Sequence, residues 1–173
     1  LLFYSMSGDP GEFDDLVDYD YQASNLSVLL RTDRLSALRR VLAEVERLLA
    51  DIDPAILKIC LDTGHSHYAG SDPVPFMARH MERIAYVHFK DLDPAVKADV
   101  VAKCAGFYDA CGQGIFCNLG KGVTDFQAVR KLLLDSGYRG WCTVEQDCDP
   151  TGPTSPVDDA RANRAYLSSI GFN

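Results

Sequence analysis

Three short apolar runs in this chain each end on a residue type that binds metals, and this pattern constrains the fold most. The runs are residues 58–62, 84–88 and 141–145. They are rich in Ile, Val and aromatic side chains, which predicts β-strands. Long stretches with helical spacing separate them, so the three strands are expected to lie parallel in a βαβ array.

The last residues of these runs are Asp62, His88 and Glu145. Parallel strands end at one shared edge of a sheet, so all three side chains are expected within reach of one ion. Two carboxylates and an imidazole suit a divalent cation such as Mn²⁺, Co²⁺, Mg²⁺ or Zn²⁺. A polar strand end that simply emerges into a loop is the simpler explanation for any one of them. The three together favour a metal site.

The length limits the architecture. The 173 residues are expected to form a single α/β domain, residues 1–173, although a closed (β/α)₈ barrel usually needs about 250 residues. The fold is therefore expected to be open or to be a piece of a larger one. The first residue is Leu and not Met, which favours a piece of a longer protein, although processing is an alternative.

Composition excludes several classes of partner. A net charge of −8 and a pI near 4.8 argue against nucleic acid, which is bound through clustered Lys and Arg. No apolar run is long enough to cross a bilayer, so no membrane partner is expected. The six cysteines show no CxxC spacing, and Cys60 and Cys142 fall inside predicted strands. They are expected to be small buried residues rather than disulfides or zinc ligands, which fits a reducing cytoplasm.

The remaining chain alternates helix with strand. A helix is predicted from the cap Thr32 to Asp53-Pro54, a turn over 63–70, and a helix opened by Asp72-Pro73. Residues 94–111 have helical character and lead into a Gly-rich loop, 112–122. Further helices are predicted from Asp125 to Gly137 and over 157–170, and Trp141 is expected in the core. Residues 1–31 predict no clear element.

Five segments occur in an order typical of one family: Leu-Asp-Thr-Gly-His at 61–65, Val-His-Phe-Lys-Asp at 87–91, Gly-Ile-Phe through Asp-Phe at 114–126, Gly-Tyr-Arg-Gly-Trp at 137–141, and Val-Glu-Gln-Asp at 144–147. Together they resemble the sugar isomerase/epimerase group of xylose isomerase-like TIM barrels, most closely its inosose dehydratase branch. The resemblance covers about residues 45–173, and residues 1–31 do not follow the family pattern. It implies an incomplete parallel barrel that corresponds to the C-terminal part of a (β/α)₈ barrel.

The resemblance also assigns roles to residues. It implies metal ligation by Asp62, His88 and Glu145, and substrate contact by His65. The family usually has a further Glu ligand on the preceding strand, and no segment here matches that strand. From its chemistry we expect Lys90 to bind substrate, with an ordinary salt bridge as the alternative, and Asp147 to support the metal or His88.

These residues predict a chemistry. A divalent cation, Mn²⁺ or Co²⁺ first, would act as a Lewis acid on a polyhydroxy ketone or cyclitol and stabilise an enediolate. Glu145 would transfer the proton, and His65 would bind a hydroxyl or protonate the leaving group. Loss of a hydroxyl makes a lyase such as inosose dehydratase. Return of the proton makes an epimerase or isomerase.

Two other classes of function compete with this enzyme. The chain could be a catalytically inactive partial barrel that serves as a binding or assembly module, with open strand edges that favour homo-oligomers. A DNA-repair endonuclease of the same superfamily would need more His and carboxylate ligands and a basic groove. This acidic chain has only four His.

Overall fold

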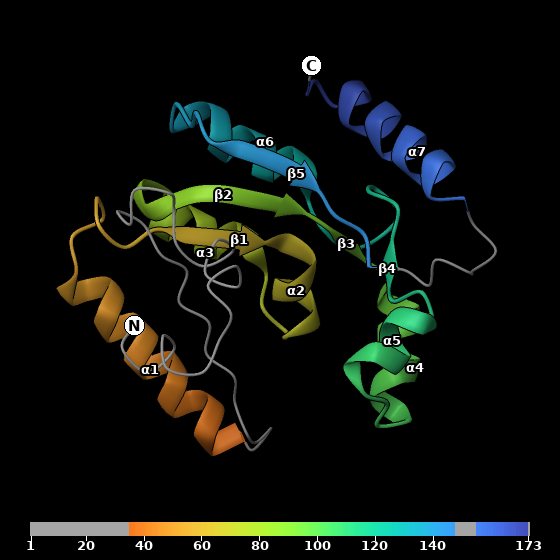
Figure 1. Ribbon diagram of the computed structural model, residues 1–173, viewed down its shortest axis with the longest axis horizontal. Coiled ribbons are helices and arrows are strands. Elements are labelled where there is room, and N and C mark those ends of the chain that lie inside the picture. Colours follow the sequence, from red (N-terminus) through yellow and green to blue (C-terminus); the bar gives the residue numbers. More distant parts are fainter. Residues whose placement is uncertain (1–34, 148–154, 173) are drawn as a thin grey trace, which may run out of the picture. The chain divides into compact units, whose positions relative to one another are not determined.

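The computed structural model describes residues 35–147 and 155–172 (Figure 1). Contacts divide the chain into two compact units, Leu1–Leu48 and Leu49–Asn173, and each is considered by itself. The prediction of one domain over residues 1–173 stays a prediction. The elements are α1 (Leu35–Asp51), β1 (Ile59–Asp62), α2 (Thr63–Tyr68), α3 (Pro73–His80), a 3-10 turn (Met81–Arg83), β2 (Ile84–Phe89), β3 (Asp91–Leu92), α4 (Pro94–Ala102), α5 (Phe107–Gly112), β4 (Phe116–Cys117), α6 (Phe126–Asp135), β5 (Trp141–Val144) and α7 (Pro156–Ser169).

The three predicted strands form one parallel sheet in the order β1-β2-β5, and their arrows point the same way in Figure 1. Asp62 lies opposite His88 in the β1–β2 register, and His88 lies opposite Thr143 in the β2–β5 register. The predicted βαβ array of parallel strands is confirmed. Because each strand follows a helix and runs in the same direction, the strand ends do share one edge of the sheet.

One face of the sheet carries the core. Leu61, Val87 and Phe89 point to this face and are at most 6% exposed. They pack against Met77 of α3, Val129 of α6 and other apolar residues of α6 and α7 in a single cluster. Since successive strand residues point to opposite faces, Asp62 and His88 are directed to the other side.

The opposite face of the sheet is open in the described part of the chain, and this corrects two predictions. Cys60 on β1 and Cys104 after α4 are exposed, and Cys111, Cys117 and Cys142 are half-buried, so none of the five described cysteines is fully buried as predicted. Trp141 is 81% exposed instead of lying in the core. Within the unit Leu49–Asn173, the described residues place no second layer over this face. The five described cysteines are free thiols.

Aspartates cap several of the described helices, as the sequence predicts for Asp72 and Asp125 but not for Asp93. Asp72, Asp93 and Asp125 cap α3, α4 and α6, and each side chain accepts a hydrogen bond from a backbone N–H of the first turn. The helix predicted to end at Asp53-Pro54 is α1, which ends at Asp51; its cap Thr32 lies outside the described residues. Buried Arg83 donates hydrogen bonds to the carbonyls of Leu49, Ile52 and Leu57 at that end.

Two predicted segments differ from the structure. The turn expected over 63–70 is the short helix α2, because the Asp62 side chain caps it. The helical stretch expected over 94–111 is divided into α4 and α5, because Cys104 adopts a left-handed φ of 51° between them. The chain around these two helices also forms a small antiparallel pair, β3–β4, over a second apolar cluster.

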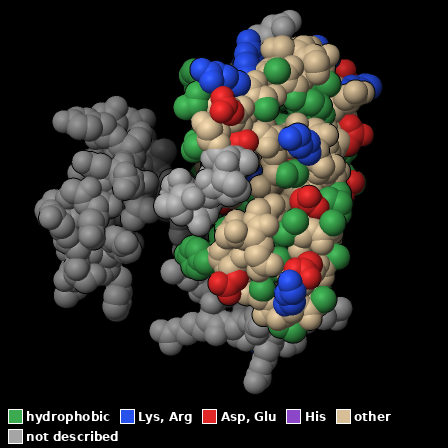
Figure 2. Space-filling view, turned by 90° about the vertical axis from the view of Figure 1, so that its right-hand side faces the viewer, with side chains coloured by type: hydrophobic (Ala, Val, Ile, Leu, Met, Phe, Trp, Pro, Cys, Tyr) green, Lys and Arg blue, Asp and Glu red, His purple; other side chains and the backbone are tan. Residues whose placement is uncertain are grey.

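Two surface properties follow from the composition. None of the described helices is long and apolar enough to cross a membrane. On the face shown in Figure 2, the described Lys and Arg side chains stand among acidic and hydrophobic ones and form no continuous basic surface.

Candidate metal centre

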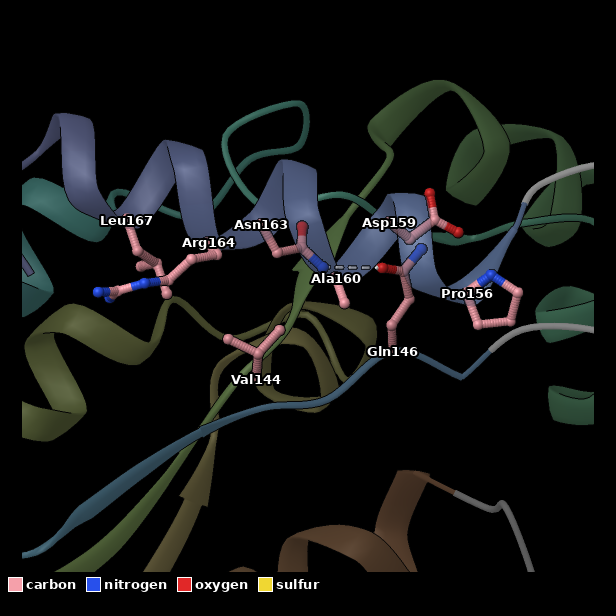
Figure 3. Close-up of a pocket in the computed structure, with 8 residues that line it drawn as sticks. All are labelled: Val144, Gln146, Pro156, Asp159, Ala160, Asn163, Arg164 and Leu167. Carbon is pink, nitrogen blue, oxygen red and sulfur yellow. Dashed lines mark hydrogen bonds between the residues drawn. The ribbon is translucent and has the colours of Figure 1, made fainter.

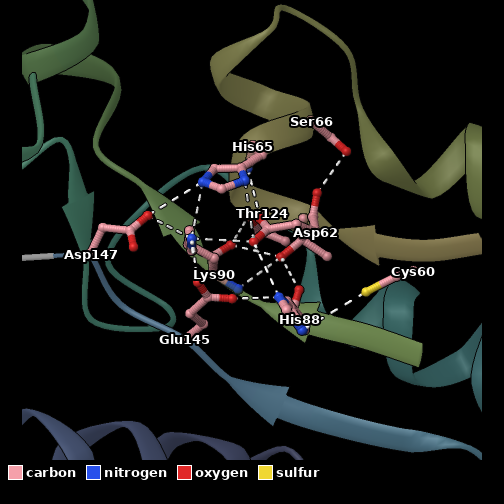
Figure 4. A network of polar contacts seen from close by, with 10 residues as sticks. Cys60, Asp62, His65, Ser66, His88, Lys90, Thr124, Glu145 and Asp147 are labelled. Atoms are coloured by element: carbon pink, nitrogen blue, oxygen red, sulfur yellow. Dashed lines mark hydrogen bonds and ion pairs between the residues drawn. The ribbon is translucent and has the colours of Figure 1, made fainter. Parts of the chain in front are cut away.

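The side chains of Asp62, His88 and Glu145 meet at the C-terminal edge of the sheet (Figure 4). Each offers one ligand atom, and these atoms all lie within 4.8 Å of one another. The register brings Asp62 beside His88, and a hydrogen bond of 3.0 Å from the Glu145 N–H to the Phe89 carbonyl continues the β2–β5 ladder by one residue. Backbone pairing therefore fixes the positions of the Cα atoms from which all three side chains extend.

The two carboxylate oxygens of Asp62 have different partners. Oδ1 accepts the N-cap hydrogen bond from the His65 N–H at 2.7 Å. Oδ2 is buried, and no group in the described part of the chain donates a hydrogen bond to it, although Lys90 Nζ lies 3.2 Å away in an ion pair. A buried carboxylate oxygen without a hydrogen bond is costly, so this atom is suited to bind a cation.

The ring of His88 is held on both sides. Its Nδ1 contacts Glu145 Oε2 and lies 3.8 Å from Asp62 Oδ2. Its Nε2 lies 3.8 Å from the sulfur of Cys60, and the ring of Tyr86 packs edge-on at 4.8 Å between centroids. Burial raises the pKa of the Cys60 thiol, and the charges of Asp62 and Glu145 add to this effect. The Cys60 sulfur is a neighbour of His88 and lies outside the group of converging ligand atoms formed by Asp62, His88 and Glu145.

Lys90 is the fully buried cation of the cluster, with a side chain that is 0% exposed. Thr63 Oγ1 fixes its main chain by donating to the Lys90 carbonyl at 2.7 Å and accepting from its N–H at 3.0 Å. Burial lowers the pKa of Lys90, but the hydrogen bond to Asp147 and the neighbouring carboxylate charges outweigh this effect and raise the pKa above its ordinary value. Lys90 is therefore a fixed positive charge at neutral pH.

Gly64 makes room for the stem of Lys90. A Cβ atom at Gly64 would lie 2.5 Å from Lys90 Cγ and 2.8 Å from Lys90 Cβ. We expect Gly64→Ala to lower the free energy of unfolding by about 1–3 kcal/mol, because these atoms are close to the backbone and cannot move away freely. Urea denaturation measures the change. Gly112→Ala is the matched control, since no atom lies within 4 Å of its added Cβ, and an equal loss there would contradict the prediction.

Asp147 has other partners than the sequence predicts. It does not contact His88; its Oδ2 accepts a hydrogen bond from Lys90 Nζ at 2.7 Å and lies 3.3 Å from His65 Nε2, and support of a metal ion stays a prediction. The difference arises because the chain after β5 brings Asp147 to the far side of Lys90, away from His88 (Figure 4). Burial raises the pKa of Asp147, but the hydrogen bonds and charges of Lys90 and His65 together outweigh this effect, and the pKa is lowered.

His65 lies at the rim of the cluster beside an aromatic wall. Its side chain is 46% exposed, and its ring packs against Phe107 and Phe116 at centroid distances of 5.8 and 5.4 Å. Lys90 Nζ lies 4.9 Å from the centre of the Phe116 ring, a cation–π contact. Phe107 and Phe116 form this aromatic wall. The sequence did not predict it, because an aromatic residue in the segment between β2 and α6 carries no signal of where its side chain packs.

Lys90 and Asp91 follow strand β2. Lys90 faces the cluster of candidate ligands, whereas the Asp91 side chain points away from it. The Asp91 carboxylate accepts hydrogen bonds of 2.9–3.0 Å from the N–H groups of Gly120, Gly122, Thr124 and Leu92. The Gly-rich loop 112–122 therefore uses the amides of Gly120 and Gly122 to bind an internal carboxylate.

The comparison with known families is decisive for the fold. A model of the xylose isomerase-like TIM barrel family matches residues 33–170. The chain belongs to this family. The predicted resemblance and the barrel-type fold class are confirmed, and among the described residues the strands form an open sheet and not a closed barrel.

Relatives in the xylose isomerase-like family include enzymes named inosose dehydratase. The protein of Halalkalibacterium halodurans is 36% identical over 132 residues, which are 74% of this chain and 42% of the relative. That of Erwinia tasmaniensis is 38% identical over 128 residues, 72% of this chain and 42% of the relative. The chain thus spans less than half the length of these relatives.

Solved structures of the family share the fold. A sugar phosphate isomerase/epimerase from Parabacteroides distasonis superposes with a TM-score of 0.50 and 20% identity, over 72% of this chain and 35% of that one. A fusion of a xylose isomerase-like TIM barrel with a 4-hydroxyphenylpyruvate dioxygenase superposes with a TM-score of 0.53 and 21% identity. The match covers 74% of this chain and 19% of the fusion protein.

The charge balance of the cluster suits a divalent ion. Asp62, Glu145 and Asp147 all pair with the single ammonium of Lys90. Without counting the two imidazoles, three carboxylates and one ammonium leave two formal negative charges in a partly buried site, and a divalent cation would neutralise them. The residues present therefore fit such an ion.

A pocket lies elsewhere, between β5 and α7 (Figure 3). Val144 and Gln146 line one side and residues of α7 line the other, with a hydrogen bond of 3.1 Å between Gln146 and Asn163. None of the three candidate ligands lines this pocket. It brings together no comparable group of ionisable side chains, so the chemistry is assigned to the cluster at the strand ends.

Proposed function

We propose that Asp62, His88 and Glu145 bind a divalent cation and that the protein is a metal-dependent lyase or isomerase of polyhydroxy ketones. The observation that carries this proposal is the buried Oδ2 of Asp62, which faces His88 Nδ1 and accepts no hydrogen bond within the described residues. Mn²⁺ or Co²⁺ is our first choice, and Mg²⁺ or Zn²⁺ would also suit two carboxylates and an imidazole. The inosose dehydratase relatives make dehydration of an inosose the first specific reaction.

When bound, the cation would supply Lewis acidity, which stabilises negative charge on a ketone oxygen and makes the neighbouring C–H more acidic. The side chain of Glu145 is 38% exposed, so its carboxylate can reach a bound substrate and accept the α-proton. The ammonium of Lys90 adds a fixed positive charge next to the developing oxyanion.

His65 completes the reaction from the rim. In a dehydration the bond between the β-carbon and its hydroxyl breaks, and the hydroxyl leaves as water with a proton that the His65 imidazole donates. In an epimerisation or isomerisation the proton taken by Glu145 returns to another face or carbon, and His65 only holds a hydroxyl. The same residues serve both outcomes, so an epimerase or isomerase is the second candidate.

Two measurements test the proposal. Calorimetric titration of the metal-free protein with Mn²⁺ is expected to show one site in the micromolar range, and the loaded protein is expected to convert an inosose to a product with a new dione absorbance. Binding without turnover would favour the inactive partial barrel as a binding or assembly module. Absence of micromolar binding by each of the four cations would refute the metal site itself.

A further inference from the structure

We propose that Asp147 is a positioning residue that holds the ammonium of Lys90 away from the cation ligands and so keeps them free to bind. This inference rests on the cation site proposed above. It concerns a residue that the three-ligand arrangement does not include, and it assigns Asp147 an effect on cation affinity that acts through Lys90.

The ammonium of Lys90 has four polar partners around it at graded distances. Asp147 Oδ2 is nearest at 2.7 Å and His65 Nε2 follows at 3.0 Å, both with the geometry of hydrogen bonds. Asp62 Oδ2 at 3.2 Å and Glu145 Oε1 at 3.3 Å are ion-pair contacts only. The strongest bond therefore points away from the two carboxylates that would hold the cation.

Because Lys90 is buried, the loss of Asp147 would force its ammonium to pair with another carboxylate. The Lys90 side chain is 0% exposed, and a buried ammonium has to keep a counter-charge because water cannot replace it. Without the Asp147 carboxylate, the nearest remaining anions are Asp62 and Glu145. Both oxygens already lie within hydrogen-bonding distance of the ammonium, at 3.2 and 3.3 Å. A reorientation of the ammonium toward them would therefore turn these ion pairs into hydrogen bonds.

An ammonium bonded to Asp62 Oδ2 and Glu145 Oε1 would compete with a divalent cation. It would occupy lone pairs of the ligand oxygens and bring a positive charge closer to the centre. Loss of Asp147 thus acts in two ways: it removes one nearby negative charge, and it releases Lys90 onto the ligands. Only the second effect depends on the presence of Lys90, so a double-mutant cycle separates the two.

The experiment measures the Kd for Mn²⁺ by calorimetry in the wild type, Asp147→Asn, Lys90→Met and the double variant. We expect Asp147→Asn to raise Kd by about 10-fold or more, as is typical of residues that support metal ligands. In the Lys90→Met background the same substitution is expected to produce a markedly smaller change. Asp147→Glu, which keeps the carboxylate, is expected to restore most of the affinity.

Controls exclude plain charge and folding effects. Asp158→Asn removes an equal charge from an exposed pair with Arg161 and is expected to leave Kd unchanged because solvent and salt screen it. The Asp147 side chain is 34% exposed and lies outside the helices and strands, so its replacement is expected to leave the fold intact, which circular dichroism verifies. Asp147→Ser provides a second replacement of different shape.

The outcomes are distinct. An equal fold-change in the wild-type and Lys90→Met backgrounds would overturn the positioning role and leave only a charge effect. An unchanged Kd for Asp147→Asn and Asp147→Ser would overturn the inference while the cation site stands. A wild type that binds no Mn²⁺ would overturn both, and the first titration of the series reveals it.

Discussion

Replacement of Glu145 by Gln is expected to raise the Kd for a divalent cation by more than about 100-fold, beyond the range typical of residues that only support ligands. The amide keeps the shape of the side chain but removes the charge next to His88 Nδ1 and presents a weaker oxygen donor. Calorimetry with Mn²⁺ measures the loss.

The same substitution is expected to abolish turnover of an inosose wherever the wild type shows it, because an amide cannot accept the α-proton. Glu82→Gln is the matched control, since it changes an exposed carboxylate of the Met81–Arg83 turn in the same way. Substantial remaining activity in Glu145→Gln would remove Glu145 from the proton-transfer role, and unchanged affinity would remove it from the ligands.

The largest expected effect on stability lies at Asp91. Its carboxylate is 0% exposed and accepts hydrogen bonds from four backbone N–H groups, three of them in the loop before α6. Asp91→Asn replaces one acceptor oxygen by an NH₂ group that faces N–H donors. We expect the free energy of unfolding to fall by about 3 kcal/mol or more, since hydrogen bonds to a buried charge are among the strongest in a protein.

Urea denaturation in the presence of a chelator measures this loss without a contribution from bound cations. Asp93→Asn is the control, because Asp93 is an N-cap of α4 and Asn caps helices about as well as Asp. Its unfolding free energy is expected to change little. A similar small change in Asp91→Asn would show that the loop amides find other acceptors.

The parts of the fold that depend on local chemistry could be predicted from the sequence. The three strands are visible because apolar β-formers precede a polar strand end, and α3 and α6 are visible because an aspartate caps each one. The meeting of Asp62, His88 and Glu145 follows from the parallel direction of the strands alone. Their role as ligands remains a prediction.

The parts that depend on tertiary contacts could not be predicted. The partner of Asp147 is set by the path of the chain after β5, and the position of Phe116 by the β3–β4 pair. Trp141 is exposed because the described residues cover only one face of the sheet, a fact that no property of Trp141 encodes. The short helix α2 could not be predicted, because its start depends on the hydrogen bond from the His65 N–H to the Asp62 side chain.

The aromatic wall beside His65 comes from a different segment than the candidate ligands. Phe107 and Phe116 belong to the excursion between β2 and α6, whereas Asp62 and His88 stand on paired strands. Substitutions in the segment between β2 and α6 can therefore reshape the space next to His65 while the atoms of the candidate ligands keep their positions. If the strand ends bind a cation as proposed, exchange of this one surface segment would change which substrate rings and hydroxyl patterns fit beside His65 without moving the cation ligands.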